Sequence, residues 1–107
     1  MSVDLIVLRP EGLYCPAGDF HIDPWRPVPR AVITHGHADH ARSGSDLYHS
    51  AAPGSALLQH RLGTDAVIQG HAYGSRLALG AARVSLHPAG HILGSAQVRV
   101  EVGNQVW

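Results

Sequence analysis

Short apolar runs separated by turn residues fill most of this chain and predict a domain built chiefly from strands. The pattern is clearest over residues 97–102, where three valines alternate with Arg99 and Glu101, so that the strand has one buried and one wet face. Gly103 and Asn104 then predict a two-residue hairpin turn. Strands are expected at residues 3–8, 13–15, 20–22, 31–34, 47–49, 65–69, 77–79, 83–86 and 97–102.

Two segments carry helical signals instead. Pro53 suits the first turn of a helix over residues 53–62, whose three leucines share one face, and Gly63 ends it. A shorter helix is expected over residues 38–42. A few helices among many strands predict an α+β fold class. The return strand after the hairpin breaks off at Trp107, which suggests a domain that continues beyond the given sequence.

Composition indicates the size of the domain and its cellular compartment but says little about its function. The chain has 107 residues, 45% of them apolar, and this allows one small domain at most. The formal net charge is zero, so no overall field recruits nucleic acid or an anionic membrane. The single Cys15 cannot form an internal disulfide, which fits a reducing compartment. Without a signal peptide or an apolar run near the roughly 20 residues of a membrane span, we expect a cytoplasmic protein.

Potential metal ligands are concentrated directly after the apolar strand at residues 31–34. Three histidines and one aspartate follow within six positions: His35, His37, Asp39 and His40. Imidazole nitrogen and carboxylate oxygen are the ligands of catalytic zinc sites. In extended backbone His35 and His37 project to the same side. The other two fall where the chain is expected to turn, so the motif predicts parts of two adjacent metal sites.

The ligand count needs a contribution from elsewhere in the chain. A catalytic zinc usually has three protein ligands and one open position. His91 is the best third partner for His35 and His37, because the glycines around it let the backbone bend closely. Asp23, at the tip of an expected strand, is a candidate ligand of the second metal, but ordering the site through a hydrogen bond to a ligand suits it equally well. The remaining ligands of the second metal are expected after Trp107.

Other polar residues give weaker signals. Three histidines show no partner pattern and are expected to be structural: His21, His49 and His71. Three arginines close to the motif are candidates for contacts with backbone phosphates: Arg26, Arg30 and Arg42. For these arginines, ordinary surface exposure is an alternative of about equal weight.

The chain resembles the metallo-β-lactamase superfamily in two motifs, T-H-G-H-A-D-H at residues 34–40 and P-A-G-H-I-L-G-S-A at residues 88–96. It looks most like the β-CASP-type nuclease branch. The stretch L-Y-C-P-A-G-D-F-H-I-D-P-W at residues 13–25 is similar to the bacterial ligase-associated DNA exonucleases, also labelled mRNA 3′-end processing factors. The A-G-H-x-L-G-S form favours the nuclease branch less decisively, since glyoxalase-type hydrolases carry a similar loop.

The resemblance implies a fold and a set of roles. Residues 1–107 would be the N-terminal half of an αβ/βα sandwich, with the C-terminal half and the β-CASP domain absent. One zinc would be held by His35, His37 and His91, and the other by Asp39 and His40. These last two are the predicted catalytic residues, with Asp39 a ligand first and a proton acceptor second. Asp23 matches the strand-end aspartate that orders the site.

The implied activity is metal-dependent hydrolysis of phosphodiester bonds, of a DNA exonuclease type. Two divalent ions, zinc in the first place and manganese as the alternative, would share a bridging hydroxide that attacks phosphorus. The implied partners are a DNA or RNA substrate and a DNA ligase or helicase system, with no membrane. The isolated 107 residues are expected to be inactive.

Three alternatives stay open at this point. The first is an RNA 3′-end-processing nuclease, and the second is a small-molecule metallo-hydrolase of glyoxalase or lactamase type. The third is a non-catalytic module stabilised by zinc. Structural zinc sites are closed by four protein ligands. A site of His35, His37 and His91 has only three, which argues against the zinc-stabilised module.

Overall fold

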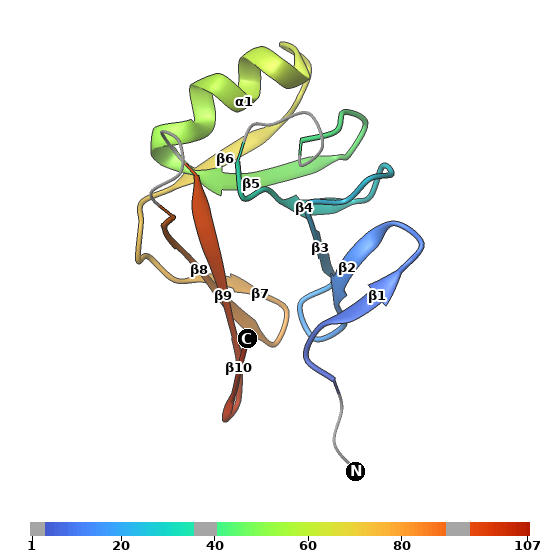
Figure 1. Ribbon diagram of the computed structural model, residues 1–107, viewed down its shortest axis with the longest axis vertical. Coiled ribbons are helices and arrows are strands. Elements are labelled where there is room, and N and C mark those ends of the chain that lie inside the picture. The colour runs from blue at the N-terminus through green and yellow to red at the C-terminus, as the bar shows by residue number, and fades with distance from the viewer. Residues whose placement is uncertain (1–3, 36–40, 90–94) are drawn as a thin grey trace.

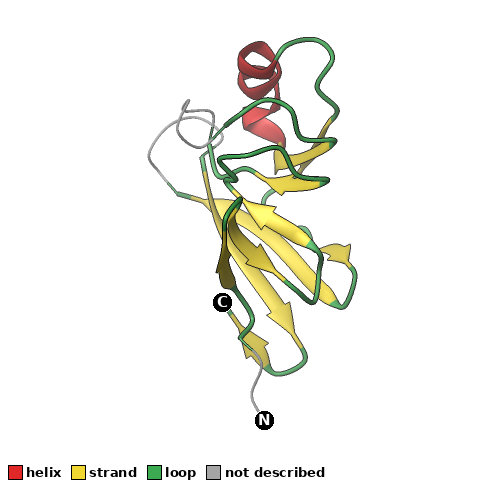
Figure 2. Cartoon of the chain, turned by 90° about the vertical axis from the view of Figure 1, so that its right-hand side faces the viewer, coloured by secondary structure: helices red, strands yellow, loops and turns green. Residues whose placement is uncertain are grey.

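The computed structural model describes residues 4–35, 41–89 and 95–107, which form two β-sheets and one short α-helix (Figures 1 and 2). Strands hold 44% of the described residues and helices 12%, so the domain is rich in β-structure. None of the helical segments described has the length and apolar character that crossing a bilayer requires.

The first sheet has six strands in chain order: β1 (Val7–Arg9), β2 (Gly12–Cys15), β3 (Phe20–Ile22), β4 (Arg30–Val32), β5 (Leu47–Ala51) and β6 (Ile68–His71). The first three strands form an antiparallel meander, whereas β3 to β6 run parallel. Neighbouring parallel strands end at the same edge of a sheet. The segments that leave β3 and β4 therefore emerge side by side, and this positions the candidate site.

The second sheet has four antiparallel strands in the order β10-β9-β8-β7: β7 (Leu77–Leu79), β8 (Ala82–Pro88), β9 (Ala96–Val102) and β10 (Gln105–Val106). The predicted hairpin is confirmed, since Val102 pairs with Gln105 across a two-residue turn. Gly103 has φ +56 there, in the left-handed region that glycine adopts at little cost. The predicted strands over residues 83–86 and 97–102 are also confirmed, each slightly longer than expected.

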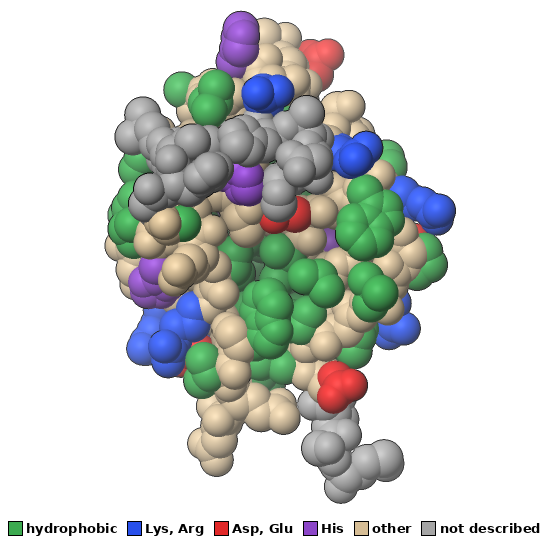
Figure 3. Space-filling model, in the orientation of Figure 1, with side chains coloured by type: hydrophobic (Ala, Val, Ile, Leu, Met, Phe, Trp, Pro, Cys, Tyr) green, Lys and Arg blue, Asp and Glu red, His purple; other side chains and the backbone are tan. Residues whose placement is uncertain are grey.

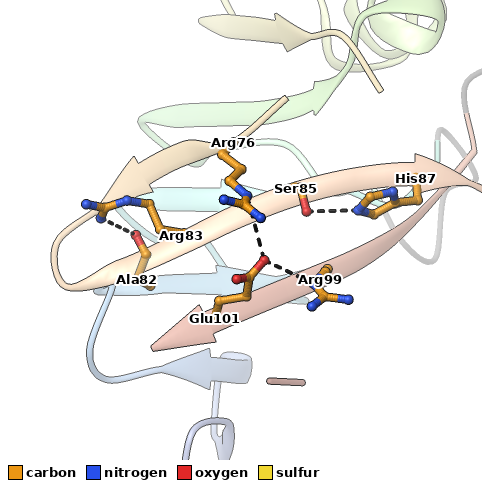
Figure 4. A network of polar contacts seen from close by, with 7 residues as sticks. All are labelled: Arg76, Ala82, Arg83, Ser85, His87, Arg99 and Glu101. Atoms are coloured by element: carbon orange, nitrogen blue, oxygen red, sulfur yellow. Dashed lines mark hydrogen bonds and ion pairs between the residues drawn. The ribbon is translucent and has the colours of Figure 1, made fainter. Parts of the chain in front are cut away.

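The outer face of the second sheet is polar, as the alternation in β9 predicts (Figure 4). Nε of Arg99 donates to Oε1 of Glu101 at 3.0 Å, and Nε of Arg76 lies 3.9 Å from the same oxygen. On β8, Oγ of Ser85 and Nε2 of His87 are 2.8 Å apart. The face is therefore polar and carries two short side-chain contacts and one longer ion pair.

The main core lies between the two sheets. Its fully buried members come from the inner faces of both: Cys15, Phe20, Val32, Ala82, Val84, Leu86 and Val100. Burying a side chain such as Phe or Leu contributes roughly 1.5–3 kcal/mol. Hydrophobic side chains also gather at the centre of the face drawn in Figure 3.

A second cluster covers the other face of the first sheet near β4 to β6. Helix α1 (Ser55–Leu62) follows a 3-10 turn (Ala52–Gly54) and buries Leu58 against Ala31 and Tyr48. Gly63, at φ +95, ends the helix. The helix predicted over residues 53–62 is therefore confirmed, with its first residues in the 3-10 turn.

The predicted α+β class and half-sandwich are wrong for the described chain. The structure is a small β-rich domain with two sheets and one short α-helix. The physical reason is that most apolar runs are only three to five residues long and are bounded by turn residues, a length that suits strands and not helices. The half-sandwich followed from the resemblance and not from this pattern.

Several local predictions also need correction or stay untested. The strand expected at residues 3–8 is β1, confined to Val7–Arg9, and the strand expected at 31–34 ends at Val32. The strand expected at residues 65–69 is β6, shifted to Ile68–His71. Before β6 the chain is a turn that is tied to the helix, because Nε2 of Gln59 donates to the carbonyls of Gly63 and Ala66. Of the helix expected over residues 38–42, positions 41–42 are irregular and the rest lies outside the described residues.

Candidate metal centre

The candidate site begins where β3 and β4 end. Asp23 follows β3, and its backbone N–H donates to the carbonyl of Val32 at 2.9 Å. Asp23 has φ +45, a left-handed conformation that aspartate tolerates better than most residues. This turn at the strand tip directs the Asp23 carboxylate toward Thr34, two residues beyond the end of β4.

Both oxygens of the Asp23 carboxylate hold Thr34. Oδ1 accepts the backbone N–H of Thr34 at 2.8 Å, and Oδ2 accepts its hydroxyl at 2.7 Å. Hydrogen bonds to a carboxylate are short and about twice as strong as neutral ones. The backbone and side chain of Thr34 are therefore fixed together, immediately before the first histidine of the motif.

Thr34 in turn determines which nitrogen of His35 carries the proton. The threonine hydroxyl has one hydrogen, and the Asp23 carboxylate takes it because a carboxylate can only accept. Toward Nδ1 of His35, 2.9 Å away, the same oxygen can then only accept. In the neutral imidazole Nδ1 is thus the N–H donor, and Nε2 carries the lone pair that a metal requires.

Backbone hydrogen bonds join the described ends of the two sequence-distant motifs. The carbonyl of Thr34 accepts the N–H of Ala96 at 2.7 Å, so the end of β4 is joined to the start of β9. The N–H of Ala89 donates to the carbonyl of Ser95 at 3.4 Å. The chain on either side of the segment that contains His91 is therefore anchored beside the histidine motif.

The predicted site residues fall into two groups. Asp23 and His35 are described, half-buried, and joined through Thr34. Four predicted ligands lie outside the described residues: His37, Asp39, His40 and His91. Their roles stay predictions. Within the described ranges no group of three or more histidine, cysteine or acidic side chains is close enough to hold a metal ion.

The three arginines near the motif are all exposed. Nη1 of Arg30 lies 3.8 Å from Oδ2 of Asp19, a pair that solvent screens strongly. The backbone carbonyl of Arg42 accepts the hydroxyl of Tyr48 at 2.7 Å. Their exposure agrees both with contacts to backbone phosphates and with an ordinary place on the surface.

A histidine pair that the sequence did not predict lies between the sheets. Nδ1 of His49 on β5 and Nε2 of His71 on β6 are 2.9 Å apart, and His49 is 2% exposed. Nε2 of His49 is buried and, in the described chain, has no hydrogen-bond partner. Burial, followed by His71 and Arg30, lowers the pKa of His49 to about 4. Both rings are therefore neutral at pH 7, and the sequence held no signal for their pairing because they are 22 positions apart.

Comparison with known proteins gives one partial likeness. No family model matches the chain. A protein of Opitutus terrae named probable DNA ligase is 37% identical to this chain over 93 residues. The matched segment is 86% of this chain and 9% of that protein. A segment similar to this chain thus occurs within a much longer polypeptide.

Proposed function

We propose that this chain takes part in the metal-dependent hydrolysis of phosphodiester bonds in DNA, as part of an exonuclease-type enzyme. The observation that carries the proposal is the chain of hydrogen bonds from Asp23 through Thr34 to His35. A histidine oriented by a hydrogen bond on one ring nitrogen is the usual arrangement of a metal ligand. The motif that begins at His35, and its resemblance to the β-CASP-type nucleases, support the same proposal.

The choice of DNA, and of a link to DNA ligation, rests on the relative. That protein is named a probable DNA ligase, and the segment similar to this chain is a small part of it. This supports a role beside a DNA ligase, as the resemblance to ligase-associated exonucleases implies. DNA is therefore preferred over RNA as substrate.

The residues present fit a divalent cation. The donor set offers imidazole and carboxylate, and Thr34 leaves the lone pair of His35 on Nε2. His35, His37 and His91 would hold one ion, and Asp39 and His40 the other. When bound, such ions supply an activated water and neutralise charge on phosphoryl oxygens.

The described residues have positioning roles in this proposal. Asp23 holds the Thr34 hydroxyl, Thr34 keeps the proton of His35 on Nδ1, and His35 presents Nε2. The bond from Ala96 to Thr34 ties the start of β9 to the same point. A ligand held in this way loses little conformational entropy on binding, because its position is fixed beforehand.

The test is cleavage of labelled nucleic acid. The full-length protein that contains this chain, and not the isolated 107 residues, would be offered single-stranded DNA, duplex DNA and RNA with zinc or with manganese. His35→Ala in the same full-length protein would serve as the inactive variant. We expect metal-dependent shortening of DNA by the protein and its loss in His35→Ala. Turnover of a thioester or a lactam without cleavage of any nucleic acid would contradict the proposal and favour a small-molecule hydrolase.

A further inference from the structure

A cleft of about 290 Å³ opens on the outer face of the first sheet, over β1 to β3. It is lined by Arg9, Glu11, Tyr14, Asp19, His21 and the loop over residues 27–29. The pairing of Tyr14 with His21 places both on the face opposite the buried Cys15 and Phe20. Helix α1 packs on this same outer face farther along, near β6, and lies away from β1 and β2 (Figure 1).

The floor of the cleft is aromatic. The rings of Tyr14 and His21 lie with centroids 4.6 Å apart and planes tilted by 40°, and the guanidinium of Arg9 lies 5.7 Å from the Tyr14 centroid. The Tyr14 hydroxyl donates to Oδ1 of Asp19 at 2.8 Å, which fixes the phenol ring in place. Burial lowers the pKa of His21, so its ring is neutral at pH 7. Neutral, fixed rings of this kind are platforms on which planar bases stack.

Two charged side chains of the cleft, Glu11 and Arg9, are available to form hydrogen bonds with a ligand. Oε1 of Glu11 is 3.9 Å from Nε2 of His21, which is too long for a hydrogen bond. Across the residues that the structure describes, neither the Glu11 carboxylate nor the Arg9 guanidinium makes a hydrogen bond. The cleft thus offers a carboxylate acceptor and a guanidinium donor around an aromatic floor.

We propose that this cleft binds one base of a single-stranded nucleic acid, and that it prefers bases with an exocyclic amino group. Carboxylates accept hydrogen bonds from such amino groups, as they do from N4 of cytosine. Thymine has no amino group to donate. Arg9 donates to the phosphate or to a base carbonyl. The proposal rests on the nucleic-acid function proposed above for the kind of ligand, and it adds a site of base preference.

The cleft also lies close along the chain to the candidate metal centre. His21 lies on β3 and Asp23 follows directly after the end of that strand, and the loop over residues 27–29 leads directly into β4. A nucleic-acid strand bound in the cleft would therefore contact β3 and the loop before β4, the same elements that lead to Asp23 and His35. Base preference at the cleft would select which nucleotides are held near the site.

The test measures binding without cleavage. Fluorescence anisotropy in the presence of EDTA would compare oligo(dC) and oligo(dT) of about ten nucleotides, a length comparable to one single-strand site. We expect oligo(dC) to bind more tightly, and Tyr14→Ala to weaken its binding about tenfold, as lost stacking predicts. Glu11→Ala should remove the preference for oligo(dC). Free dCMP in a parallel titration distinguishes a nucleotide site from a strand site, because a strand site binds the oligomer far better.

Matched variants distinguish the loss of a contact in the cleft from a general change in charge or folding. Arg9→Gln and Arg61→Gln each remove one exposed positive charge, but Arg61 lies on α1 away from the cleft. Only Arg9→Gln should weaken binding. Tyr14→Phe keeps the ring but loses the bond to Asp19, so it should retain more binding than Tyr14→Ala. An unfolding midpoint of Tyr14→Ala close to that of the unchanged protein shows that its weaker binding is not misfolding.

Two results would overturn the inference. They are equal affinity of the unchanged protein for oligo(dC) and oligo(dT), and unchanged affinity in Tyr14→Ala. Either result leaves the cleavage test intact, because that test depends on metal and on His35. Failure of cleavage with a normal preference for oligo(dC) would instead remove the proposed catalytic function and keep the cleft.

Discussion

At the scale of single residues, the main finding is that a threonine hydroxyl decides the chemistry of a histidine. Because Asp23 takes the only hydroxyl hydrogen of Thr34, the contact with Thr34 favours a neutral His35 ring with its proton on Nδ1 and its lone pair on Nε2. The sequence suggested Asp23 as an ordering residue, but it held no indication that Thr34 lies between Asp23 and His35. The structure shows it: the left-handed turn at Asp23 directs its carboxylate to Thr34.

Replacing Thr34 with valine keeps the shape of the side chain and removes the hydroxyl. We expect Thr34→Val to weaken zinc binding about 10–100-fold, the usual effect of losing a group that orients a metal ligand. Competition with a chromophoric chelator measures the affinity. Thr34→Ser keeps the hydroxyl and should bind nearly normally, and Thr64→Val, at an exposed position, should change nothing. Normal zinc affinity in Thr34→Val would contradict the role given to the hydroxyl.

The buried His49 predicts a dependence of stability on pH. In the folded chain its pKa is lowered from 6.5 to about 4, so between these values the unfolded chain binds a proton that the folded chain does not. The free energy of unfolding should therefore be highest above pH 6.5 and fall, by on the order of 3 kcal/mol, as the pH drops to about 4. Urea unfolding at a series of pH values measures this.

Variants identify the group responsible. His49→Leu should flatten most of the slope, while His71, whose pKa burial also lowers, retains a smaller part. His60→Gln, on the exposed side of α1, should leave the slope as it is. A slope that is identical in His49→Leu and the unchanged protein would show that another group is responsible.

At the scale of elements, backbone hydrogen bonds join the two sheets at two described places. One is the bond from Ala96 to the carbonyl of Thr34, at the candidate site. The other is the bond from Ala81 to the carbonyl of Ala17, at 3.0 Å, where the turn between β7 and β8 meets the turn between β2 and β3. These bonds fix the sheets relative to one another in addition to the shared core.

Gly80, in the turn between β7 and β8, tests the second of these junctions. A Cβ there would lie 2.6 Å from the carbonyl oxygen of Ala17, and φ is +55. We expect Gly80→Ala to lower the free energy of unfolding by about 3 kcal/mol, because strain and a backbone clash add. Gly74→Ala is the control: φ is +79, but nothing lies within 4 Å, so it should cost about 1 kcal/mol. Equal costs for the two variants would show that the junction has no role.

Individual elements could be predicted where local chemistry determines them. Pro53 and Gly63 mark the ends of the helical segment, and the Gly103–Asn104 turn sets the hairpin. Pairing between distant segments could not be predicted. Nothing in the sequence shows that β5 and β6 are parallel neighbours, and this register is what brings His49 and His71 together.

At the scale of the whole molecule, the described chain is a β-rich domain of two sheets. The candidate site lies where the ends of β3 and β4 meet the start of β9, so both sheets contribute to it. The predicted α+β class was wrong because it gave too much weight to a few helical signals: the described chain has one short α-helix against ten strands. The half-sandwich was wrong for a different reason, since it followed from the resemblance. The motif at residues 35–40 could be found from the sequence, but the residues that hold its first histidine required the fold.

The protonation state of His35 is the most direct test of this account, and ¹⁵N NMR of the labelled protein measures it. We predict that Nδ1 of His35 is protonated in the neutral ring, and that added zinc shifts the resonance of Nε2 while Nδ1 keeps its proton. Thr34→Val should remove the preference of the proton for Nδ1 over Nε2 of His35. A proton on Nε2 of His35, or resonances that zinc does not change, would contradict the claim that Asp23 and Thr34 prepare His35 to bind a metal.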